Sequence, residues 1–218
     1  MSLMNIMSKR CIGLVTMIIG ISGMAAGLGL SGYNLWDSYR AGIQADIALD
    51  AVVRYREERE EAVAADLNET QETPSELVSD FDREMQVMEL DGHRYIGTIF
   101  IPAIDVALPV QEDWSPDLLK TSPCRYMGSP YRGDLIICAH NYDTHFGWLK
   151  NLLPGDEVIF TDVEGKEFCY TVAELKTLAG TAVEEMEDGA WDLTLFTCTP
   201  GGQMRVAVRC NLLESNAA

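Results

Sequence analysis

The first pattern along the chain is a long apolar stretch near its N-terminus. Residues 11–30 form a run of twenty residues without a charge, which is enough to cross about 30 Å of hydrocarbon as a helix. Lys9 and Arg10 stand directly before it. Because basic residues favour the cytoplasmic side, we expect residues 1–10 in the cytoplasm, a transmembrane signal anchor over residues 11–32, and the rest of the chain outside. A cleaved signal peptide is the alternative, although its apolar core is normally shorter, about 7–15 residues.

A more polar helix is predicted directly after the anchor. Ile43, Ile47 and Ala51 recur at a spacing of four residues, and the sequence from Asp37 to about Asp66 is rich in residues that favour helices. Such a helix would extend the anchor as a stalk.

An acidic, polar segment follows this stalk. Residues 67–80 contain Pro74 and few apolar side chains, a composition typical of a flexible linker. A short helix is expected over residues 81–90. We therefore assign residues 33–94 to an extracytoplasmic helical stalk and acidic linker.

From residue 95 onward, short runs alternate apolar residues with small or polar ones, which is the pattern of β-strands. A short helix is expected from Phe146, with Phe146, Leu149 and Leu153 on one side. The runs that predict strands are YIGTIFIPAIDVALPV (two strands with a turn at residues 102–105), RGDLIICAH, EVIFTD, EFCYTVAELKTL, LTLFTC and MRVAVRCNLL. About seven or eight strands suit a small, mainly β domain, closed or nearly closed as a barrel, over residues 95–218.

The composition is strongly acidic, and this excludes one class of partner. The chain has 34 acidic and 16 basic residues and a formal net charge of −18. A surface of that sign repels nucleic acid and anionic lipid at long range, so no nucleic-acid partner is expected.

The six cysteines show no CxxC pair or regular spacing that would indicate a zinc site or a disulfide framework. An exported location permits disulfides. If Cys198 keeps its thiol for chemistry and Cys11 lies in the membrane, the cysteines left to pair are Cys124, Cys138, Cys169 and Cys210. The sequence leaves their pairing open.

Three residues that can carry chemistry stand at the ends of predicted strands. LTLFTC ends in Cys198, and the turn sequence Thr-Pro-Gly-Gly follows at once. In MRVAVRC the alternate apolar residues belong in the core, so Arg205 faces away from it. If these two strands pair as neighbours, the Cys198 thiol and the Arg205 guanidinium come side by side. His140 ends the buried strand LIICAH and should lie at the rim of the sheet.

A thiol, an imidazole and a guanidinium together suit acyl transfer through a thioester. The thiolate is the nucleophilic form of cysteine, and a histidine can help form it and later protonate a leaving amine. An arginine keeps its charge, so it can stabilise an oxyanion or hold a substrate carbonyl. Cys198, His140 and Arg205 are therefore the predicted catalytic residues.

The same residues carry a resemblance to a known family. TLFTC over residues 194–198, followed by Arg205, resembles the TLxTC…R signature of sortases, membrane-anchored transpeptidases of Gram-positive cell surfaces. GTIFIPAIDVALPV resembles the family's opening strands, and AHNYDTHFGWLKNLLPGDEV resembles the segment in which the catalytic histidine precedes a helix. The resemblance covers residues 96–213.

This resemblance implies an eight-stranded sortase barrel with one or two short helices. Cys198 would attack the Thr–Gly bond of an LPxTG-like sorting signal, with His140 as general acid and base and Arg205 stabilising the oxyanion or positioning the substrate. Thr197 would help to order the substrate. The acceptor would be an amine, either of a peptidoglycan precursor or of a pilin lysine, and no cofactor is implied.

The chain departs from the family pattern in a few places. Ala139 stands where a glycine usually precedes the catalytic histidine, which is a small change. The sequence shows neither the Asp-Pro-aromatic lid motif nor the second, C-terminal anchor of many pilus-building sortases, and this favours attachment of proteins to the wall. The subclass stays open among B-, C- and D-like enzymes.

Alternatives remain for individual residues. His145 could replace His140, and Arg209 could replace Arg205. Cys138 shares a face with His140 and is expected to pack beneath the site.

Alternatives remain for metals and for function as well. A zinc site built from Cys138, His140 and His145 would lack a standard spacing. The acidic residues at positions 184–188 could bind calcium, although a solvated loop explains them equally. A membrane-anchored cysteine hydrolase and a non-catalytic surface binding module with the same fold are the rival functions.

Overall fold

The computed structural model of the protein describes residues 3–69 and 83–213. The predicted linker over residues 67–80 lies outside the described residues except for its first three positions, which are helical. The chain forms two compact units, Met1–Arg40 and Ala41–Ala218.

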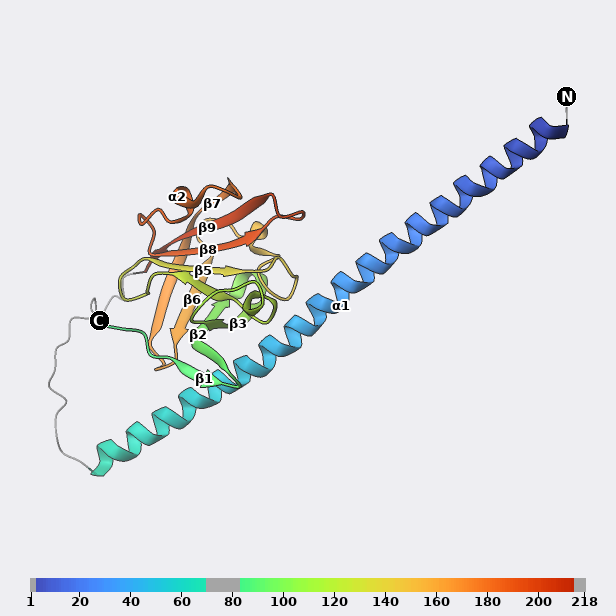
Figure 1. The fold of residues 1–218 in the computed structure, drawn as a ribbon. Helices are drawn as coiled ribbons and strands as arrows, with labels where there is room; N and C mark the ends of the chain where they lie inside the picture. Colours follow the sequence, from blue (N-terminus) through green and yellow to red (C-terminus); the bar gives the residue numbers. More distant parts are fainter. Residues whose placement is uncertain (1–2, 70–82, 214–218) are drawn as a thin grey trace. The chain divides into compact units, whose positions relative to one another are not determined.

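The N-terminal unit is the first part of a long helix, α1, which spans Leu3–Glu69 (Figure 1). Apolar side chains along this part are exposed, among them Leu14, Ile18 and Leu28. Within the described residues, α1 alone is long and apolar enough to cross a membrane, by length and composition. A membrane anchor and a signal sequence both fit this finding, and the orientation stays a prediction.

The second unit contains the β-strands, which Figure 1 shows wrapped into a barrel. In the described residues the strands are β1 (Met88–Leu90), β2 (His93–Ile101), β3 (Val106–Gln111), β4 (Cys124–Met127), β5 (Leu135–Ala139), β6 (Glu157–Asp162), β7 (Glu167–Ala179), β8 (Leu193–Cys198) and β9 (Met204–Leu212). Short helical turns interrupt them at Pro102–Ile104, Leu118–Lys120, Leu149–Asn151 and, as α2, at Val183–Met186.

Eight of these strands close the barrel. The order is β2-β3-β4-β5-β8-β9-β7-β6, and pairing of β6 with β2 completes the circle. The pairs β3–β4 and β5–β8 are parallel and the others antiparallel, so the barrel is mixed. The predicted eight-stranded barrel is confirmed, and β1 is an additional strand paired with the start of β2.

The helix predicted over residues 81–90 is wrong in the part that is described. Residues 83–87 have no regular structure and β1 follows them. Asp91 and Gly92 both have positive φ, 50° and 79°, as a tight two-residue hairpin turn requires. This Asp-Gly turn folds β1 back onto β2 and buries Met88 against Tyr95.

The barrel core follows the strand alternation. Leu135, Ile137, Leu195, Val208 and Cys210 are among the buried residues that fill the interior. Inward-facing residues at alternate positions leave Cys138 and the residues at 196, 198 and 205 on the outer wall. The predicted face of the last strand is therefore confirmed.

The short helix predicted from Phe146 is reduced to a 3₁₀ turn at Leu149–Asn151. Phe146 and Leu149 are buried as predicted, but Leu153 is 66% exposed and Leu152 is buried in its place. A 3₁₀ turn has about three residues per turn, so positions three apart share a face, which excludes Leu153.

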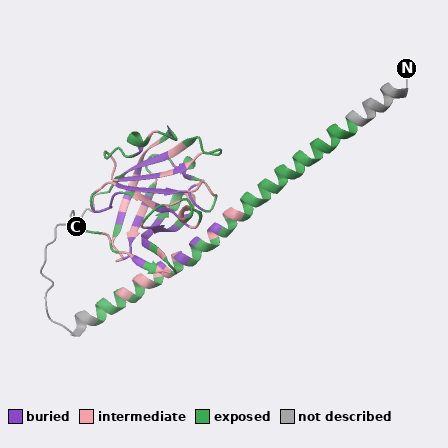
Figure 2. Cartoon of the chain, in the orientation of Figure 1, coloured by how far each residue is buried: buried purple, intermediate pink, exposed green. Residues whose placement is uncertain are grey.

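The helix predicted from Asp37 to Asp66 is confirmed as part of α1, but a different face of it is packed. Ile43 and Ile47 are exposed. The buried positions in this stretch are Ala41, Ala45, Ala48 and Val52 (Figure 2). Small side chains allow the helix backbone to lie close to the barrel, and this benefit outweighs the larger apolar area of isoleucine.

Candidate active site

Neighbouring strands bring together the three residues predicted to be catalytic. β5 and β8 run parallel with Ala139 opposite Thr197, so the next residue of each strand, His140 and Cys198, reach the same edge. β8 and β9 are antiparallel with Cys198 directly opposite Arg205. The predicted side-by-side placement of thiol and guanidinium is confirmed, and Cys198 lies between the other two residues.

All three side chains line one groove on the outer wall of the barrel, with a volume of about 310 Å³. Most of the other lining residues are apolar: Trp114, Leu119, Ala179, Ala182, Val183, Met186 and Phe196, together with Tyr126 and Cys138. The groove thus combines an extended apolar wall with a small polar end, an arrangement common in ligand sites.

The turn between β8 and β9 fixes this polar end. Gly201 and Gly202 have positive φ, 86° and 73°, a conformation that costs glycine little. The Thr199 N–H donates to the Met204 carbonyl at 3.0 Å, and the Gly202 N–H donates to the Thr199 carbonyl at 2.8 Å. The Thr-Pro-Gly-Gly sequence therefore ends β8 at the cysteine and returns the chain so that the arginine lies beside it.

Backbone carbonyls bind one nitrogen of the Arg205 guanidinium. Its Nη1 donates to the carbonyls of Gly202 at 2.9 Å and Met204 at 3.1 Å. Within the described residues, its Nε and Nη2 have no hydrogen-bond partner. The side chain is thus anchored at one nitrogen and keeps donors for an anionic or carbonyl oxygen in the groove.

His140 begins a tightly turned loop, residues 140–147. The Phe146 N–H donates to the His140 carbonyl at 3.1 Å, and the Gly147 N–H donates to the Tyr142 carbonyl at 2.9 Å. The His140 and Tyr142 rings lie 4.8 Å apart. A Cβ atom at position 147 would lie 2.7 Å from the Tyr142 oxygen, so only glycine fits there. The loop backbone and the tyrosine ring together restrict where the imidazole can lie.

His145, the alternative histidine, is fully buried and is not among the groove residues. Burial, with the nearby His140 as a second cause, lowers the pKa of His145 to about 4. Within the described residues, neither ring nitrogen has a hydrogen-bond partner. Of the two histidines, only His140 is placed to meet a ligand in the groove.

Arg209, the alternative arginine, is buried and has a different task. Its Nη1 donates to the Met186 carbonyl at 3.0 Å and to Thr194 Oγ1 at 2.7 Å, and its Nη2 donates to the Glu185 carbonyl. It therefore secures α2, which forms one wall of the groove.

Thr197 lies behind the groove, not in it. It is buried, and its hydroxyl donates to the Ala139 carbonyl at 2.8 Å. This bond ties the end of β8 to the residue before His140, so Thr197 can act on the site through the strand ends.

Cys138 lines the groove but is 4% exposed, and Cys124 lies opposite it on β4. Burial raises the pKa of Cys138 to about 12 and raises the pKa of Cys124 as well. Both thiols are therefore protonated at neutral pH and are poor nucleophiles. The structure records the thiols of Cys124, Cys138, Cys169, Cys198 and Cys210 as free.

Within the described residues, no group of three or more His, Cys, Asp or Glu side chains is arranged to hold a metal ion. In the acidic loop, the Glu187 carboxylate accepts a hydrogen bond from the Tyr126 hydroxyl at 3.0 Å. This contact joins β4, which supplies Tyr126 to the groove, to the acidic loop.

Sequence reasoning missed the aromatic wall of the groove. Trp114 and Tyr126 have ring centroids 5.9 Å apart, and Tyr126 and Phe196 form a T-shaped pair with centroids 5.5 Å apart. Phe196 could have been found, because it shares a strand face with Cys198. The other two come from distant segments, and no local pattern places them at the site.

Comparisons with known proteins agree with this geometry. The family model described as Sortase domain matches residues 99–213. Among curated proteins, no relative matches the chain.

Several solved structures have a similar fold. Sortase C1 of Streptococcus agalactiae is 24% identical with a TM-score of 0.52, covering 67% of this chain and 80% of its own. Sortase C of Streptococcus pneumoniae is 24% identical with a TM-score of 0.51, covering 79% and 96%. Sortase C of Clostridium perfringens, solved with the C-terminal cell wall sorting motif, is 21% identical with a TM-score of 0.49, covering 78% and 91%. The first two likenesses support the barrel fold.

Proposed function

Since this chain belongs to the sortase family of transpeptidases, we propose that it cleaves an LPxTG-like sorting signal and transfers the acyl part to an amine. The observation that carries the proposal is the register of three adjacent strands, which places Cys198 between His140 and Arg205 at the end of one groove. No other described thiol combines exposure in the groove with such neighbours.

In the proposed reaction the Cys198 thiolate attacks the carbonyl carbon of the Thr–Gly bond. The carbonyl oxygen becomes an oxyanion, which the free donors of Arg205 stabilise without giving up a proton. His140 protonates the leaving amine of glycine as the C–N bond breaks. The product of this half-reaction is a thioester between Cys198 and the threonine carbonyl.

An amine then attacks the thioester carbonyl. His140 accepts the proton of the incoming amine, and the cysteine leaves as a thiolate, so the enzyme returns to its starting state. The acceptor class is a primary amine, of a peptidoglycan precursor or a pilin lysine. The apolar wall suits the apolar residues of a sorting signal, since burial of such side chains contributes about 1.5–3 kcal/mol each.

We assign Thr197 a positioning role in this scheme. Its bond to the Ala139 carbonyl couples the strand that ends in the nucleophile to the strand that ends in the imidazole. The residues from 33 onward, including the catalytic domain, would lie outside the membrane, where sorting-signal substrates and amine acceptors are displayed.

The test uses the full-length chain in detergent micelles with a panel of quenched LPxTG-type peptides and an amine acceptor. We expect cleavage at the Thr–Gly bond, a mass-identified peptide–amine conjugate, and loss of both with Cys198→Ala. Cleavage that survives Cys198→Ala, or no cleavage of any peptide in the panel, would reject the proposal. Release of free acid at the same rate with and without the amine would instead identify a hydrolase.

A further inference from the structure

Within the second compact unit, residues 41–45 of α1 pack on the segment that carries His140, whereas the next buried positions of the helix pack against β1 and β2. Ala41 and Ala45 are each 1% exposed. Ala45 belongs to the same core cluster as Phe146 and Leu149, which follow His140 in the chain. This stretch of helix therefore packs as part of the barrel domain, although it precedes all of the strands in the sequence.

Gly42 lies close to Thr144. A Cβ atom at position 42 would lie 2.9 Å from Thr144 Cγ2 and 3.2 Å from Thr144 Cβ, closer than carbon atoms normally approach. Glycine is unfavourable inside a helix by about 1 kcal/mol relative to alanine. Its presence here is explained by the contact, because only a residue without a side chain lets the helix lie against the loop.

Three neighbouring aromatic rings, those of His145, Tyr142 and His140, connect this contact with the active site. His145, next to Thr144, is fully buried, and the Ala41 backbone is near enough to affect its ionisation. The His145 ring lies 5.4 Å from that of Tyr142, and the Tyr142 ring lies 4.8 Å from that of His140. The helix thus contacts the loop at residues that are linked to His140 through ring contacts.

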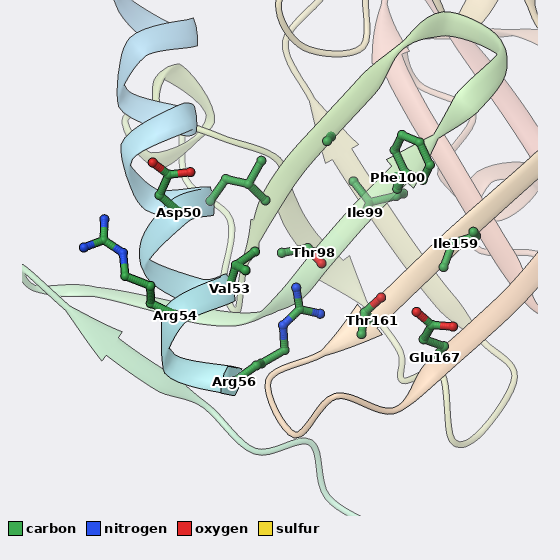
Figure 3. A pocket seen from close by; sticks show the side chains of 12 residues that line it. Asp50, Val53, Arg54, Arg56, Thr98, Ile99, Phe100, Ile159, Thr161 and Glu167 are labelled. Atoms are coloured by element: carbon green, nitrogen blue, oxygen red, sulfur yellow. The ribbon is translucent and has the colours of Figure 1, made fainter. Parts of the chain in front are cut away.

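A neighbouring part of the helix is much less tightly packed. A cavity of about 560 Å³ lies between α1 and the strands β2 and β6, and Val53, Arg56, Thr98 and Glu167 are among its lining residues (Figure 3). Added bulk at position 53 has room, whereas added bulk at position 42 has none. The two positions therefore form a matched pair for substitution.

We infer that residues 41–45 of α1 are a positioning element of the catalytic site, holding the loop 140–147 so that the His140 imidazole stays within reach of Cys198. A stalk that served only as a spacer would need neither a glycine facing Thr144 nor small residues along one face. This inference rests on the proposed function, in which His140 moves the protons, and it assigns Gly42 and Thr144 no contact with substrate.

The experiment compares the full-length Gly42→Leu and Val53→Leu variants with the wild type. Displacement of the loop by less than an ångström weakens proton transfer more than binding, so we expect Gly42→Leu to lower kcat roughly tenfold with KM nearly unchanged. Val53→Leu should match the wild type. Gly42→Ala should cause a smaller loss, and adding Thr144→Ala should restore activity, because the second change removes the methyl group that is too close.

Two measurements need no peptide substrate and keep the inference separate from the proposed function. Amide hydrogen exchange of residues 145–147 should accelerate in Gly42→Leu while the β6–β7 hairpin stays protected. The pH profile of Cys198 alkylation by iodoacetamide should also change, since it depends on where the imidazole lies. If wild-type peptide turnover is absent, the proposed function fails, and these two measurements still decide the inference.

Unchanged loop exchange and an unchanged alkylation profile in Gly42→Leu would overturn the inference. Failure of Thr144→Ala to rescue Gly42→Ala would do the same, because a non-specific loss of stability is not repaired by a smaller partner. If Gly42→Leu does not fold, as judged by thermal melting, the single variant Gly42→Ala and the double variant with Thr144→Ala are used in its place. Peptide turnover, hydrogen exchange and alkylation are then measured on these two variants.

Discussion

The guanidinium of Arg205 has two tasks, anchoring the side chain and supplying donors to the groove. Replacing it by lysine keeps the positive charge, so the change tests whether the shape of the guanidinium matters. One nitrogen is bound by the Gly202 and Met204 carbonyls, and within the described residues the other two have no hydrogen-bond partner. Lysine carries the same charge on a single nitrogen and has no planar fork. It cannot keep the anchoring bonds and reach an oxyanion at once.

We therefore expect Arg205→Ala to lower kcat/KM for peptide cleavage by about 10²–10³-fold, as for the loss of an oxyanion donor. Arg205→Lys should have a kcat/KM less than a tenth of the wild-type value. Arg132→Ala, at an arginine outside the groove that pairs with Asp134, serves as the control and should match the wild type. Turnover by Arg205→Ala within twofold of the wild type would show that the guanidinium takes no part in the reaction.

His145 makes a separate prediction about stability. Its pKa is about 4 in the folded protein, below its ordinary value of 6.5, because burial disfavours the charged imidazole. Between these values the unfolded chain binds a proton that the folded chain does not, so stability falls as pH drops from about 6.5 to about 4. The loss amounts to roughly 3 kcal/mol, and above pH 6.5 this residue contributes no pH dependence.

Replacing the imidazole by a ring that does not titrate should remove this component. We expect the difference in unfolding free energy between wild type and His145→Phe to change across pH 4–6.5 and to stay constant above it. Chemical denaturation at a series of pH values measures this difference, and comparing the two chains cancels the titration of carboxylates. Parallel pH curves for the two chains would contradict the burial of a neutral imidazole.

Individual residues show what strand alternation can and cannot predict. Alternation correctly placed Arg205 on the outer face, and it placed Arg209 there too. What distinguishes them is that α2 covers Arg209, and no local pattern reveals which segment will cover a given face. For the same reason the sequence could suggest His140 over His145 by family likeness, but could not show that His145 is buried.

At the scale of elements, closure of the barrel depends on a close approach between β2 and β6. A Cβ atom at Gly97 would lie 2.2 Å from the Thr161 carbonyl oxygen and 2.9 Å from Asp162 Cα. Both are backbone atoms, which cannot move without opening the pairing of the two strands. Closure of the barrel through the pairing of β2 with β6 therefore requires glycine at position 97.

Gly97→Ala should destabilise the protein by on the order of 3 kcal/mol, the range for changes that force backbone displacement. Gly155→Ala is the matched control, because Gly155 also has a positive φ, 98°, but has nothing within 4 Å of a Cβ atom. That change should cost only the conformational penalty of about 1–2 kcal/mol. Urea denaturation measures both, and equal losses would show that the approach to Thr161 is relaxed at little cost.

Most elements of the barrel were predictable because each is a short run with its own alternation and turn residues. The predictions that failed, which include the unpredicted strand β4 and the helix expected from Phe146, have different causes. β1 was not predicted because a strand of three residues is too short to show an alternation of apolar and polar positions. The Asp91-Gly92 sequence is nevertheless a strong hairpin signal. The packed face of α1 was missed because hydrophobic periodicity favours isoleucine, whereas close packing on the barrel selected alanine and glycine.

At the scale of the whole molecule, the extent of the second compact unit was the least predictable feature. It begins at Ala41, inside a helix whose sequence indicates only a stalk. The helix is joined to the strands by a long polar segment, so the chain gives no local sign that the two pack together. Contacts such as Arg59 to Glu164 at 2.8 Å join residues too far apart in sequence for any window to detect.

The N-terminal part of α1 leads to the last prediction. Its apolar side chains, such as Ile18 and Ile21, are more than half exposed, and burying each in lipid contributes about 1.5–3 kcal/mol. A helix of this kind should hold the chain in a membrane without cleavage. In bacteria we expect the full-length mass to sediment with membranes and to resist extraction by alkaline carbonate.

Orientation and anchoring can be measured in the same cells. Protease added to protoplasts should digest residues 83–213 while an N-terminal tag stays protected, because Lys9 and Arg10 favour the cytoplasmic side. The variant Ile18→Lys, Ile21→Lys places two charges in the apolar span at roughly 2.5–3.5 kcal/mol each and should weaken membrane retention. A soluble product whose new N-terminus lies within residues 24–30 would identify the segment as a cleaved signal peptide, and an accessible N-terminal tag would reverse the orientation.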